Sequence, residues 1–293
     1  MERVTHPLRI GIIGAGSMGR THARAWAGTP ARVVGVCART SASAFAREFE
    51  TQAFDSLAAM LPHVDAVDIC TPTDLHCEQA LAAFASGKHV VCEKPMARSL
   101  AEAQRMLDAA RSSGCQLLAA HVLRWFEPYA HAHEAVQRGE IGALLELHLM
   151  RRGPHPSAAQ AWFADAARSG GVMLDLLIHD IDYARWVAGD VAEVDATFVN
   201  GAAGIMLGHI GGARSIIRGD WNAPAFETAA RIVGARGSIE FDSHTTKLTS
   251  DPYVLQAQEM YRALADESQL RVTAHDAFEA LRIALAAIEC ARV

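Results

Sequence analysis

Acidic, basic and imidazole side chains recur at two places where the surrounding sequence is apolar. Glu93 and Lys94 follow a strand-like run that ends at Cys92, and Asp175 lies four residues before His179 in a second apolar segment. A lysine stabilises negative charge that develops on a reacting oxygen, and a carboxylate beside an imidazole orients a general acid or base. These residue types therefore make proton transfer the first chemistry to consider.

A glycine-rich turn lies between a strand-like run at residues 8–13 and a helix-favouring run. Its residues, G-A-G-S-M-G, fit the G-x-G-x-x-G pattern, in which the backbone approaches a pyrophosphate and a helix N-terminus points N–H groups at its charge. The alternative is a turn that serves only the close packing of strand and helix. Because a strand precedes the turn and further strands and helices follow, we predict a dinucleotide site at Gly14, Gly16, Ser17, Met18 and Gly19.

The second strand-like run, residues 32–37, ends without the acidic residue that binds the ribose 2′-hydroxyl of NAD. Ala38 occupies the position where that acid is expected, and Arg39, Thr40 and Ser41 follow. A guanidinium with neighbouring hydroxyls suits a 2′-phosphate, so NADP(H) is slightly favoured over NAD(H). The alternative treats Arg39 as a solvated loop residue and Ser41 as a helix cap.

Short β-branched runs alternate with alanine-rich, helix-favouring runs as far as residue 121, a rhythm typical of βαβ units in an α/β fold with a buried parallel sheet. Residues 127–138 predict a further helix, and later strands joined by turns favour an antiparallel sheet before a last helix from about residue 275. The predicted strands lie at 8–13, 32–37, 65–70, 88–92, 115–120, 142–150, 191–199, 204–210, 214–221, 228–233 and 237–241, with a weaker one at 51–54 and a loop at 151–157.

The helix that follows Lys94 has a predicted start and end. Pro95 keeps Lys94 out of the helix, and Ser99 with Glu102 forms a capping box where the helix begins. Gly114 lies where the helix is expected to end. Lys94 is therefore predicted to be extended at the carboxyl end of a parallel strand.

The apolar segment around Asp175 predicts a buried helix over residues 171–187. At about 100° per residue, Asp175, His179 and Asp182 fall within about 60° of one another, and Asp180 lies on nearly the opposite side. One interpretation is the exposed edge of an amphipathic helix, and the other is an Asp-His pair that projects into a cleft. No obvious third ligand and no H-E-x-x-H pattern accompanies the pair, so we predict no metal.

Composition restricts the class of partner. The 293 residues are 51% hydrophobic and 20% charged, a balance typical of a globular protein with two domains. A formal charge of −6 offers no basic surface, so we expect neither nucleic acid nor a membrane as a partner. The six cysteines are scattered and no signal peptide is recognised, so we expect a reduced, cytoplasmic protein.

The segment ICTPTDLHCEQALAAFASGKHVVCEKPMA, with the glycine turn before it, closely resembles the glucose-fructose oxidoreductase and inositol dehydrogenase family, the Gfo/Idh/MocA oxidoreductases. The resemblance continues through HVLRWFEPYAHAHEAVQRGEIG, WFADAARSGGVMLDLLIHDIDYARWVAG and RIVGARGSIEFD, and so covers nearly the whole chain. It implies a Rossmann dinucleotide-binding domain with a doubly wound parallel sheet at residues 1–121. An α/β domain for substrate binding and oligomerisation would follow at 122–293, with a large, mostly antiparallel open sheet and a last helix that is a candidate to pack back on the first domain.

The resemblance also implies roles for individual residues. The family's Thr-Pro turn and Glu-Lys-Pro segment line the nicotinamide side of the cofactor, and its lysine also reaches the substrate. Asp175 and His179 match the catalytic partners of that lysine. By position the contacts fall on Thr71, Pro72, His76, Glu93 and Lys94, while Thr73 stands where the family usually has Asn and leaves its own contact open.

Four further residues are weaker candidates for the substrate pocket. Arg124 and Trp162 match positions that approach nicotinamide or substrate in similar proteins. Arg152 and His121 lie at the ends of predicted strands, and Arg152 would suit a hydroxylated or anionic substrate. A structural role is equally compatible with each of them.

Together with the resemblance, these observations predict an NAD(P)-dependent dehydrogenase or reductase that acts on a secondary alcohol or ketone of a sugar, cyclitol or related polyol. The resemblance also implies a homodimer or homotetramer. His179 would take the hydroxyl proton, Asp175 would hold the imidazole, and Lys94 would stabilise the developing alkoxide. Two alternatives stay open. One is a hydrolase or lyase that oxidises its substrate transiently, and the other is a non-catalytic nucleotide-binding regulator.

Overall fold

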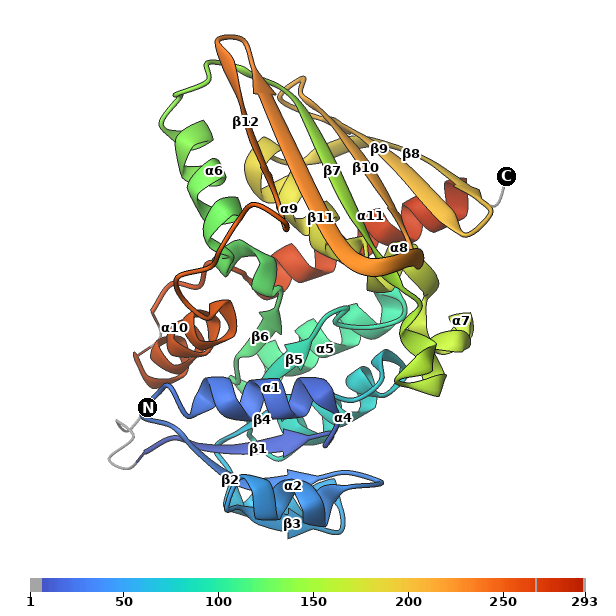
Figure 1. Ribbon diagram of the computed structural model, residues 1–293. Helices are drawn as coiled ribbons and strands as arrows, with labels where there is room; N and C mark the ends of the chain where they lie inside the picture. The colour runs from blue at the N-terminus through green and yellow to red at the C-terminus, as the bar shows by residue number, and fades with distance from the viewer. Residues whose placement is uncertain (1–6, 267, 292–293) are drawn as a thin grey trace. The chain divides into compact units, whose positions relative to one another are not determined.

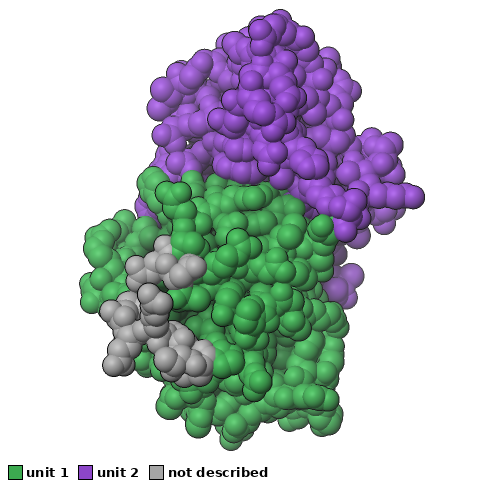
Figure 2. Space-filling view, turned by 90° about the vertical axis from the view of Figure 1, so that its left-hand side faces the viewer, with its two compact units in different colours: residues 1–125, 250–277 green, residues 126–249, 278–293 purple. Residues whose placement is uncertain are grey.

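The computed structural model describes residues 7–266 and 268–291, which form two compact units, coloured separately in Figure 2. The first unit holds the described residues of 7–125 and 250–277, and the second holds 126–249 and 278–291. The predicted domain boundary at residue 121 divides the chain once, whereas the first unit also includes a segment from near the C-terminus.

Six parallel strands form the sheet of the first unit, in the order β3-β2-β1-β4-β5-β6 (Figure 1). The order reverses between β1 and β4, and α/β sheets bind ligands beyond the carboxyl ends of the strands at such a point. The predicted doubly wound parallel sheet is confirmed. The strands are β1 (Arg9–Ile13), β2 (Arg32–Cys37), β3 (Gln52–Phe54), β4 (Ala66–Ile69), β5 (His89–Glu93) and β6 (Leu117–Ala120).

The helix after Lys94, α5, begins and ends where the sequence predicts. Ser99 Oγ accepts a hydrogen bond from the Glu102 N–H at 3.2 Å, and Gly114 ends the helix with a φ of 67°. The helices of this unit are α1 (Ser17–Trp26), α2 (Ala42–Glu48), α3 (Leu57–Met60), α4 (His76–Ala85), α5 (Leu100–Ser113) and α10 (Pro252–Asp266), with 3₁₀ turns η1 (Leu61–His63), η2 (Thr73–Leu75) and η3 (Val122–Trp125).

Helix α10 is not among the predicted elements, although a helix-start signal precedes it. The Asp251 carboxylate accepts a hydrogen bond from the Tyr253 N–H at 2.9 Å, and proline, here Pro252, is favoured in a first helical turn. Met260 of α10 packs with Trp26 of α1 in one buried apolar core. This packing explains why the segment belongs to the first unit.

The second unit contains six strands in the order β12-β11-β7-β10-β9-β8. Every neighbouring pair is antiparallel except β7 with β10, which confirms a mostly antiparallel sheet. The prediction of a loop at residues 151–157 is wrong for its first residues, because β7 continues to Pro154. Arg151 pairs with Gly219 and Thr228 on the flanking strands. The strands are β7 (Leu144–Pro154), β8 (Val191–Val199), β9 (Ala202–His209), β10 (Arg214–Asp220), β11 (Asn222–Gly234) and β12 (Gly237–Asp242).

Helices cover one face of this sheet and leave the other open (Figure 1). Two of them, α8 and α9, pack on β7, β9 and β10, where Leu147, Ile205 and Ile217 are buried. Within the described residues, every helix of either unit is too short or too polar to cross a membrane. The helices of the second unit are α6 (Glu127–Gln137), α7 (Ala166–Ser169), α8 (Gly171–Asp175), α9 (Ile178–Ala188) and most of α11 (Ala274–Cys290), with 3₁₀ turns η4 (Pro156–Ala158) and η5 (Ala161–Ala164).

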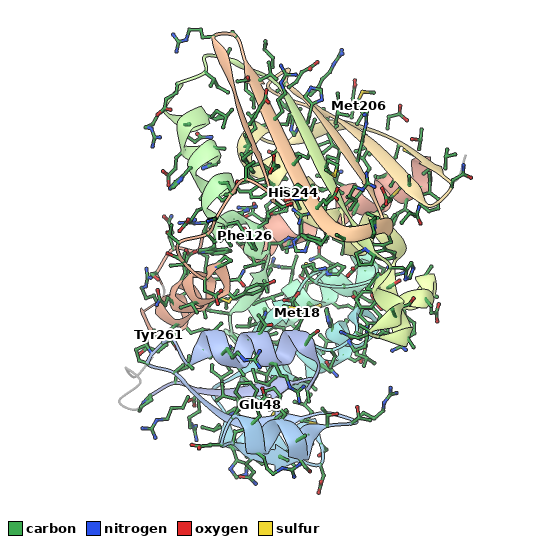
Figure 3. The ribbon with its side chains drawn as sticks, viewed as in Figure 1. Met18, Glu48, Phe126, Met206, His244 and Tyr261 are labelled. Atoms are coloured by element: carbon green, nitrogen blue, oxygen red, sulfur yellow. The ribbon has the colours of Figure 1, made fainter. Side chains whose placement is uncertain are left out.

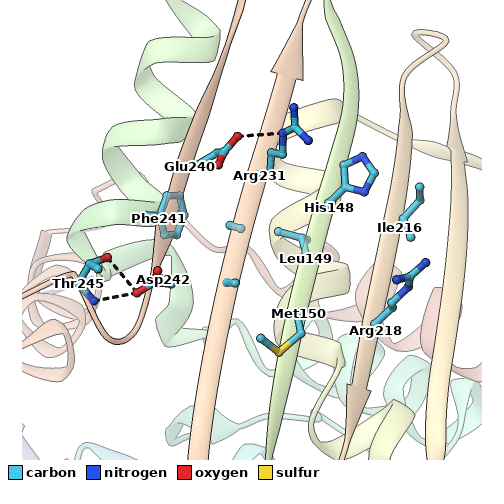
Figure 4. Close-up of a pocket in the computed structure, with 12 residues that line it drawn as sticks. His148, Leu149, Met150, Ile216, Arg218, Arg231, Glu240, Phe241, Asp242 and Thr245 are labelled. Carbon is cyan, nitrogen blue, oxygen red and sulfur yellow. Dashed lines mark hydrogen bonds and ion pairs between the residues drawn. The ribbon is translucent and has the colours of Figure 1, made fainter.

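A shallow groove of about 420 Å³ crosses the open face of the sheet (Figure 4). An ion pair at 2.9 Å between Arg231 of β11 and Glu240 of β12 lies along it, and β7 separates this pair from Ile216 and Arg218 of β10. Alternation along β10 places these two residues opposite Ile217, which is buried on the helix-covered face. The groove is therefore on the other side of the sheet from α8 and α9.

Candidate active site

The glycine turn of the first unit joins β1 to α1. Gly14 has a φ of 106°, and a Cβ there would lie 2.6 Å from the Cys70 carbonyl oxygen, while a Cβ on Gly19 would overlap the Gly14 carbonyl. A Cβ on Gly16 would meet nothing within 4 Å. The turn therefore packs closely against the end of β4 and leaves open space at Gly16, as a pyrophosphate site requires.

The first turn of α1 faces that open space with bare backbone. Gly16 is the N-cap and offers no side chain to accept from the first N–H groups. Ser17 is exposed, and Met18, which is labelled in Figure 3, is half-buried. The positive end of the helix dipole is thus presented to an anion.

The loop after β2 carries the residues predicted to receive a 2′-phosphate. Arg39, Thr40 and Ser41 are exposed, and in the described part of the chain Arg39 forms no ion pair. Ser41 has a φ of 64° and is the N-cap of α2, but its side chain makes no capping hydrogen bond. A left-handed serine is uncommon outside functional or strained positions, so side-chain capping does not account for it.

Two loops at the carboxyl ends of β4 and β5 are joined by His76. Its Nε2 lies 2.9 Å from the Thr71 carbonyl oxygen, and its Nδ1 lies 2.9 Å from the Pro95 carbonyl oxygen. Burial lowers the pKa of His76, although both carbonyls favour the protonated ring. Thr71 Oγ1 donates to Gln79 Oε1 at 2.6 Å, and Thr73 is buried at the start of η2. These contacts hold the Thr-Pro turn beside the segment that contains Lys94.

A buried network that the sequence analysis does not predict lies beneath the same two strand ends. His22 of α1 places Nδ1 2.9 Å from Asp68 Oδ2 and Nε2 2.9 Å from Glu93 Oε1. Trp26 Nε1 donates to Asp68 Oδ2 at 2.6 Å, and the Lys94 N–H donates to Glu93 Oε2 at 2.9 Å. A chain of hydrogen bonds therefore runs from Asp68 of β4 through His22 of α1 and Glu93 of β5 to the backbone of Lys94.

The charges in this network support an ion pair. Burial is the largest single effect and opposes a charge on His22, but the charges of Asp68 and Cys70 and their hydrogen bonds together outweigh burial and raise the His22 pKa well above its ordinary 6.5. Burial would raise the pKa of Glu93, but the His22 hydrogen bond and charge lower it below its ordinary value. Both shifts favour an imidazolium beside a carboxylate.

His22, Asp68 and Cys70 also bring potential metal-ligand atoms within 4.8 Å of one another. Burial raises the pKa of the Cys70 thiol to about 12, whereas metal coordination needs the thiolate. The ring nitrogens and the Asp68 carboxylate already have hydrogen-bond partners. A metal ion would have to displace these contacts, so the donor set fits a hydrogen-bonded network better.

In the second unit, the helix predicted over residues 171–187 is broken. Helix α8 ends at Asp175 and α9 begins at Ile178, and the Leu177 N–H bonds the Val172 carbonyl five residues back. One widened turn therefore separates Asp175 from His179, and a constant angle per residue does not relate them.

Burial distinguishes the two interpretations of Asp175, His179 and Asp182. Asp175 is 9% exposed and Asp182 is 1% exposed, so neither lies on a solvated helix edge. His179 is half-buried. Asp180, beside it, forms a buried ion pair in which Arg151 Nε lies 2.7 Å from Oδ2. This pair anchors the start of α9 to β7.

The remaining candidates lie in well-defined surroundings. Arg124 is 2% exposed and donates to the Arg271 carbonyl at 2.7 Å, which ties η3 to the segment after α10. His121 is fully buried. Arg152 Nε lies 3.8 Å from Glu227, and Trp162 stacks on its neighbour with ring centroids 3.9 Å apart. The packing of Arg124 is that of a structural residue, and its contact with substrate stays a prediction.

The structure brings one group of predicted residues together within the first unit. Strands β1, β4 and β5 are adjacent and parallel, so the glycine turn, Thr71, Pro72, Glu93 and Lys94 share one edge of the sheet. His22 and Asp68 are functional candidates that the sequence patterns do not indicate. A carboxylate inside an apolar strand is a signal that a buried partner exists, but it does not identify that partner.

Comparisons with known proteins agree with this architecture. A family model described as an oxidoreductase family with an NAD-binding Rossmann fold matches residues 8–121, and a GFO/IDH/MocA C-terminal domain matches residues 129–240. The 1,5-anhydro-D-fructose reductase of Ensifer adhaerens is 33% identical over 61% of this chain and 57% of its own length. The myo-inositol 2-dehydrogenase of Thermotoga maritima is 31% identical over 65% of this chain and 60% of its own length. The chain thus spans less than two thirds of these relatives.

Solved structures match over nearly the whole chain. A probable dehydrogenase from Thermotoga maritima is 25% identical, with a TM-score of 0.87 over 97% of both chains. A scyllo-inositol dehydrogenase from Lactobacillus casei, solved with NAD(H) and scyllo-inositol, is 22% identical with a TM-score of 0.87 over 98% of this chain and 97% of that chain. The second likeness shows the shared fold.

The ion pair between His22 and Glu93 predicts a pH dependence of stability. The contribution of His22 to the free energy of unfolding is full below its ordinary pKa of 6.5, and it declines as pH rises through its raised pKa. The contribution of Glu93 is full above its ordinary pKa of 4.5 and declines as pH falls through its lowered pKa. The groups that face His22 are Asp68 and Cys70 at the end of β4, Glu93 of β5 and Tyr253 of α10.

We therefore expect His22→Gln to lower the free energy of unfolding by about 3 kcal/mol between those ordinary pKa values, with a smaller loss at alkaline pH. Denaturant unfolding across pH measures this. The control is His209→Gln, since His209 is equally buried but burial lowers its pKa, so its effect does not decline as pH rises. A constant loss for His22→Gln at all pH values would contradict the charged pair.

Proposed function

Because the chain belongs to the Gfo/Idh/MocA oxidoreductase family, we propose that it transfers hydride between a nicotinamide dinucleotide and a secondary alcohol or ketone of a sugar, cyclitol or related polyol. The observation that carries the proposal is the shared edge of the first sheet, where the glycine turn follows β1 and Lys94 follows β5, with only β4 between these two strands. The sugar and cyclitol substrates of relatives such as the myo-inositol 2-dehydrogenase support the substrate class.

Residues of the first unit would hold the dinucleotide. The open space at Gly16 and the N–H groups that begin at Ser17 suit the pyrophosphate. We propose that Thr71 and Pro72 line the nicotinamide side of the cofactor site. His76 holds their loop in place. When bound, the nicotinamide supplies or accepts the hydride.

Three residues would carry the proton and the developing charge. In the direction of oxidation, His179 takes the hydroxyl proton as the carbon–oxygen bond gains double-bond character. Asp175 orients the imidazole, and the Lys94 ammonium stabilises the oxygen. In reduction, His179 returns the proton to the same oxygen. Arg152 and Trp162 are proposed to contact the substrate's other polar groups and rings.

The loop after β2 supports a preference for NADP(H). Arg39 is exposed, and Ala38 replaces the acid that would repel a 2′-phosphate. Thr40 and Ser41 add hydroxyls at the same turn. We propose that Arg39 pairs with the 2′-phosphate.

The open sheet face of the second unit supports a homodimer or homotetramer. Val199 is 64% exposed and Met206 is 45% exposed, both on the face opposite the buried Ile205, and Ile210 after β9 is 73% exposed. Exposed large apolar residues mark interaction surfaces in soluble proteins. We propose that a second copy of the chain covers this face.

The catalytic assignment predicts the effect of two alanine variants. We expect Lys94→Ala and His179→Ala each to lower kcat by about 10²- to 10⁴-fold with the best polyol substrate, because each removes a group that acts in the transition state. Both variants should keep the rise in melting temperature that the cofactor causes. Nicotinamide absorbance and thermal unfolding measure the two effects.

Exposed residues of the same types, Lys247→Ala and His244→Ala, are the matched controls and should retain full turnover. Full activity in either catalytic variant would contradict the assignment. Release of a cleaved product without net change in nicotinamide absorbance would instead support a hydrolase or lyase with transient oxidation.

The cofactor preference predicts a selective effect at Arg39. We expect Arg39→Ala to weaken NADPH binding about tenfold and to leave NADH binding unchanged, because a charge-assisted contact to the 2′-phosphate is lost. Fluorescence titration measures both dissociation constants. Arg47→Ala, at an exposed position on α2, should change neither. Equal losses for both cofactors in Arg39→Ala would exclude a 2′-phosphate contact.

A further inference from the structure

We propose that His22 is a positioning residue for Lys94: it clamps the Glu93 carboxylate, which in turn holds the Lys94 backbone at the end of β5. The importance of Lys94 rests on the proposed function. The inference goes beyond that function, because His22 lies on α1 and both of its ring nitrogens are engaged within the protein.

Both oxygens of the Glu93 carboxylate have partners within the protein. Its Oε1 lies 2.9 Å from His22 Nε2, and its Oε2 accepts a hydrogen bond from the Lys94 N–H at 2.9 Å. The carboxylate is 6% exposed and is therefore held by protein groups on both oxygens. Because the two oxygens belong to one rigid carboxylate, the contact of His22 with Oε1 also fixes Oε2, which accepts from the Lys94 N–H. His22 therefore acts on Lys94 through Glu93.

The protonation of His22 follows from its two partners. Carboxylate oxygens of Asp68 and Glu93 face its two nitrogens, and only the imidazolium donates from both. Asp68 is itself fixed, because Trp26 Nε1 donates to it at 2.6 Å. The clamp is therefore anchored by Trp26 as well as by the backbone of α1.

The position of α1 also bears on Lys94. This helix begins at the glycine turn and carries His22 in its second turn. It therefore links the proposed pyrophosphate site to the proposed catalytic lysine through one rigid element. On the other side of Lys94, His76 holds the Pro95 carbonyl at 2.9 Å. Lys94 is thus held at both neighbouring residues.

A purely structural role for His22 predicts a loss of stability alone. A positioning role also predicts a local change at Lys94 in molecules that are still folded. A small displacement of a catalytic group costs about 100-fold in rate, so the expected loss of kcat is about 10- to 100-fold. Substrate and cofactor contacts are kept, so KM should change by less than about threefold.

The experiment compares His22→Gln with His209→Gln. Both histidines are 5% exposed and engaged on both ring nitrogens, but His209 bonds Gly189 and Ser215 in the second unit. Hydrogen exchange is followed at the Lys94 amide, and turnover is measured with saturating cofactor and polyol. We expect exchange at Lys94 to be at least about tenfold faster in His22→Gln than in His209→Gln, together with the selective loss of kcat.

If His22→Gln does not fold, Glu93→Gln provides the same test, because it weakens the clamp from its other end. The double variant should lose no more kcat than the worse single variant, since both changes act through one contact. Losses that multiply would overturn the inference. So would unchanged Lys94 exchange and unchanged kcat in folded His22→Gln.

The two proposals fail in different ways. A wild-type chain without turnover on any polyol would refute the proposed function, whereas faster exchange at Lys94 in His22→Gln would still support the clamp. Normal turnover in the wild type, with no change in His22→Gln, would refute the clamp and leave the function intact.

Discussion

A histidine held between two buried carboxylates is the constraint on which the candidate site of the first unit depends. An unpaired buried charge costs several kcal/mol, so His22, Asp68 and Glu93 stabilise the fold only when all three meet. Because they come from α1, β4 and β5, their contact fixes the positions of these elements relative to one another. The glycine turn begins α1 and Lys94 follows β5, so the same contact determines the positions of the glycine turn and of Lys94.

The second unit also places a buried, charge-paired acid next to a proposed catalytic residue. Asp180 follows His179 directly, and its carboxylate is held by Arg151 of β7 at 2.7 Å. Glu93 precedes Lys94 directly, and its carboxylate is held by His22. In each unit a proposed catalytic side chain therefore adjoins a buried acid that a cation from another element anchors. Such pairs restrict the backbone without occupying the reactive group itself.

Local sequence patterns predict much of this fold. The runs that become β1, β2 and β5 are β-branched and apolar, and the start of α5 is set by Ser99. The glycine turn is recognisable because its spacing serves one backbone geometry. These features depend on neighbours in the sequence, so the sequence alone contains the information.

Features that depend on distant partners are harder to predict. The continuation of β7 depends on pairing with β10 and β11, and Leu177, at the break before α9, packs against Gly219 of β10. The residues around Asp68 indicate only a strand, and those around His22 indicate only a helix. The two side chains come together only in the folded structure. Within each unit the candidate residues were therefore identifiable by type, whereas the contacts that hold them were not.

The charge on His22 is the most direct test of this account. Nitrogen NMR of a histidine-labelled sample, with the His22 signal assigned by its absence from His22→Gln, measures the protonation of both ring nitrogens across pH. We predict that both remain protonated at neutral pH and that the titration midpoint lies well above the ordinary value of 6.5. A neutral ring with a single N–H at neutral pH would contradict the account.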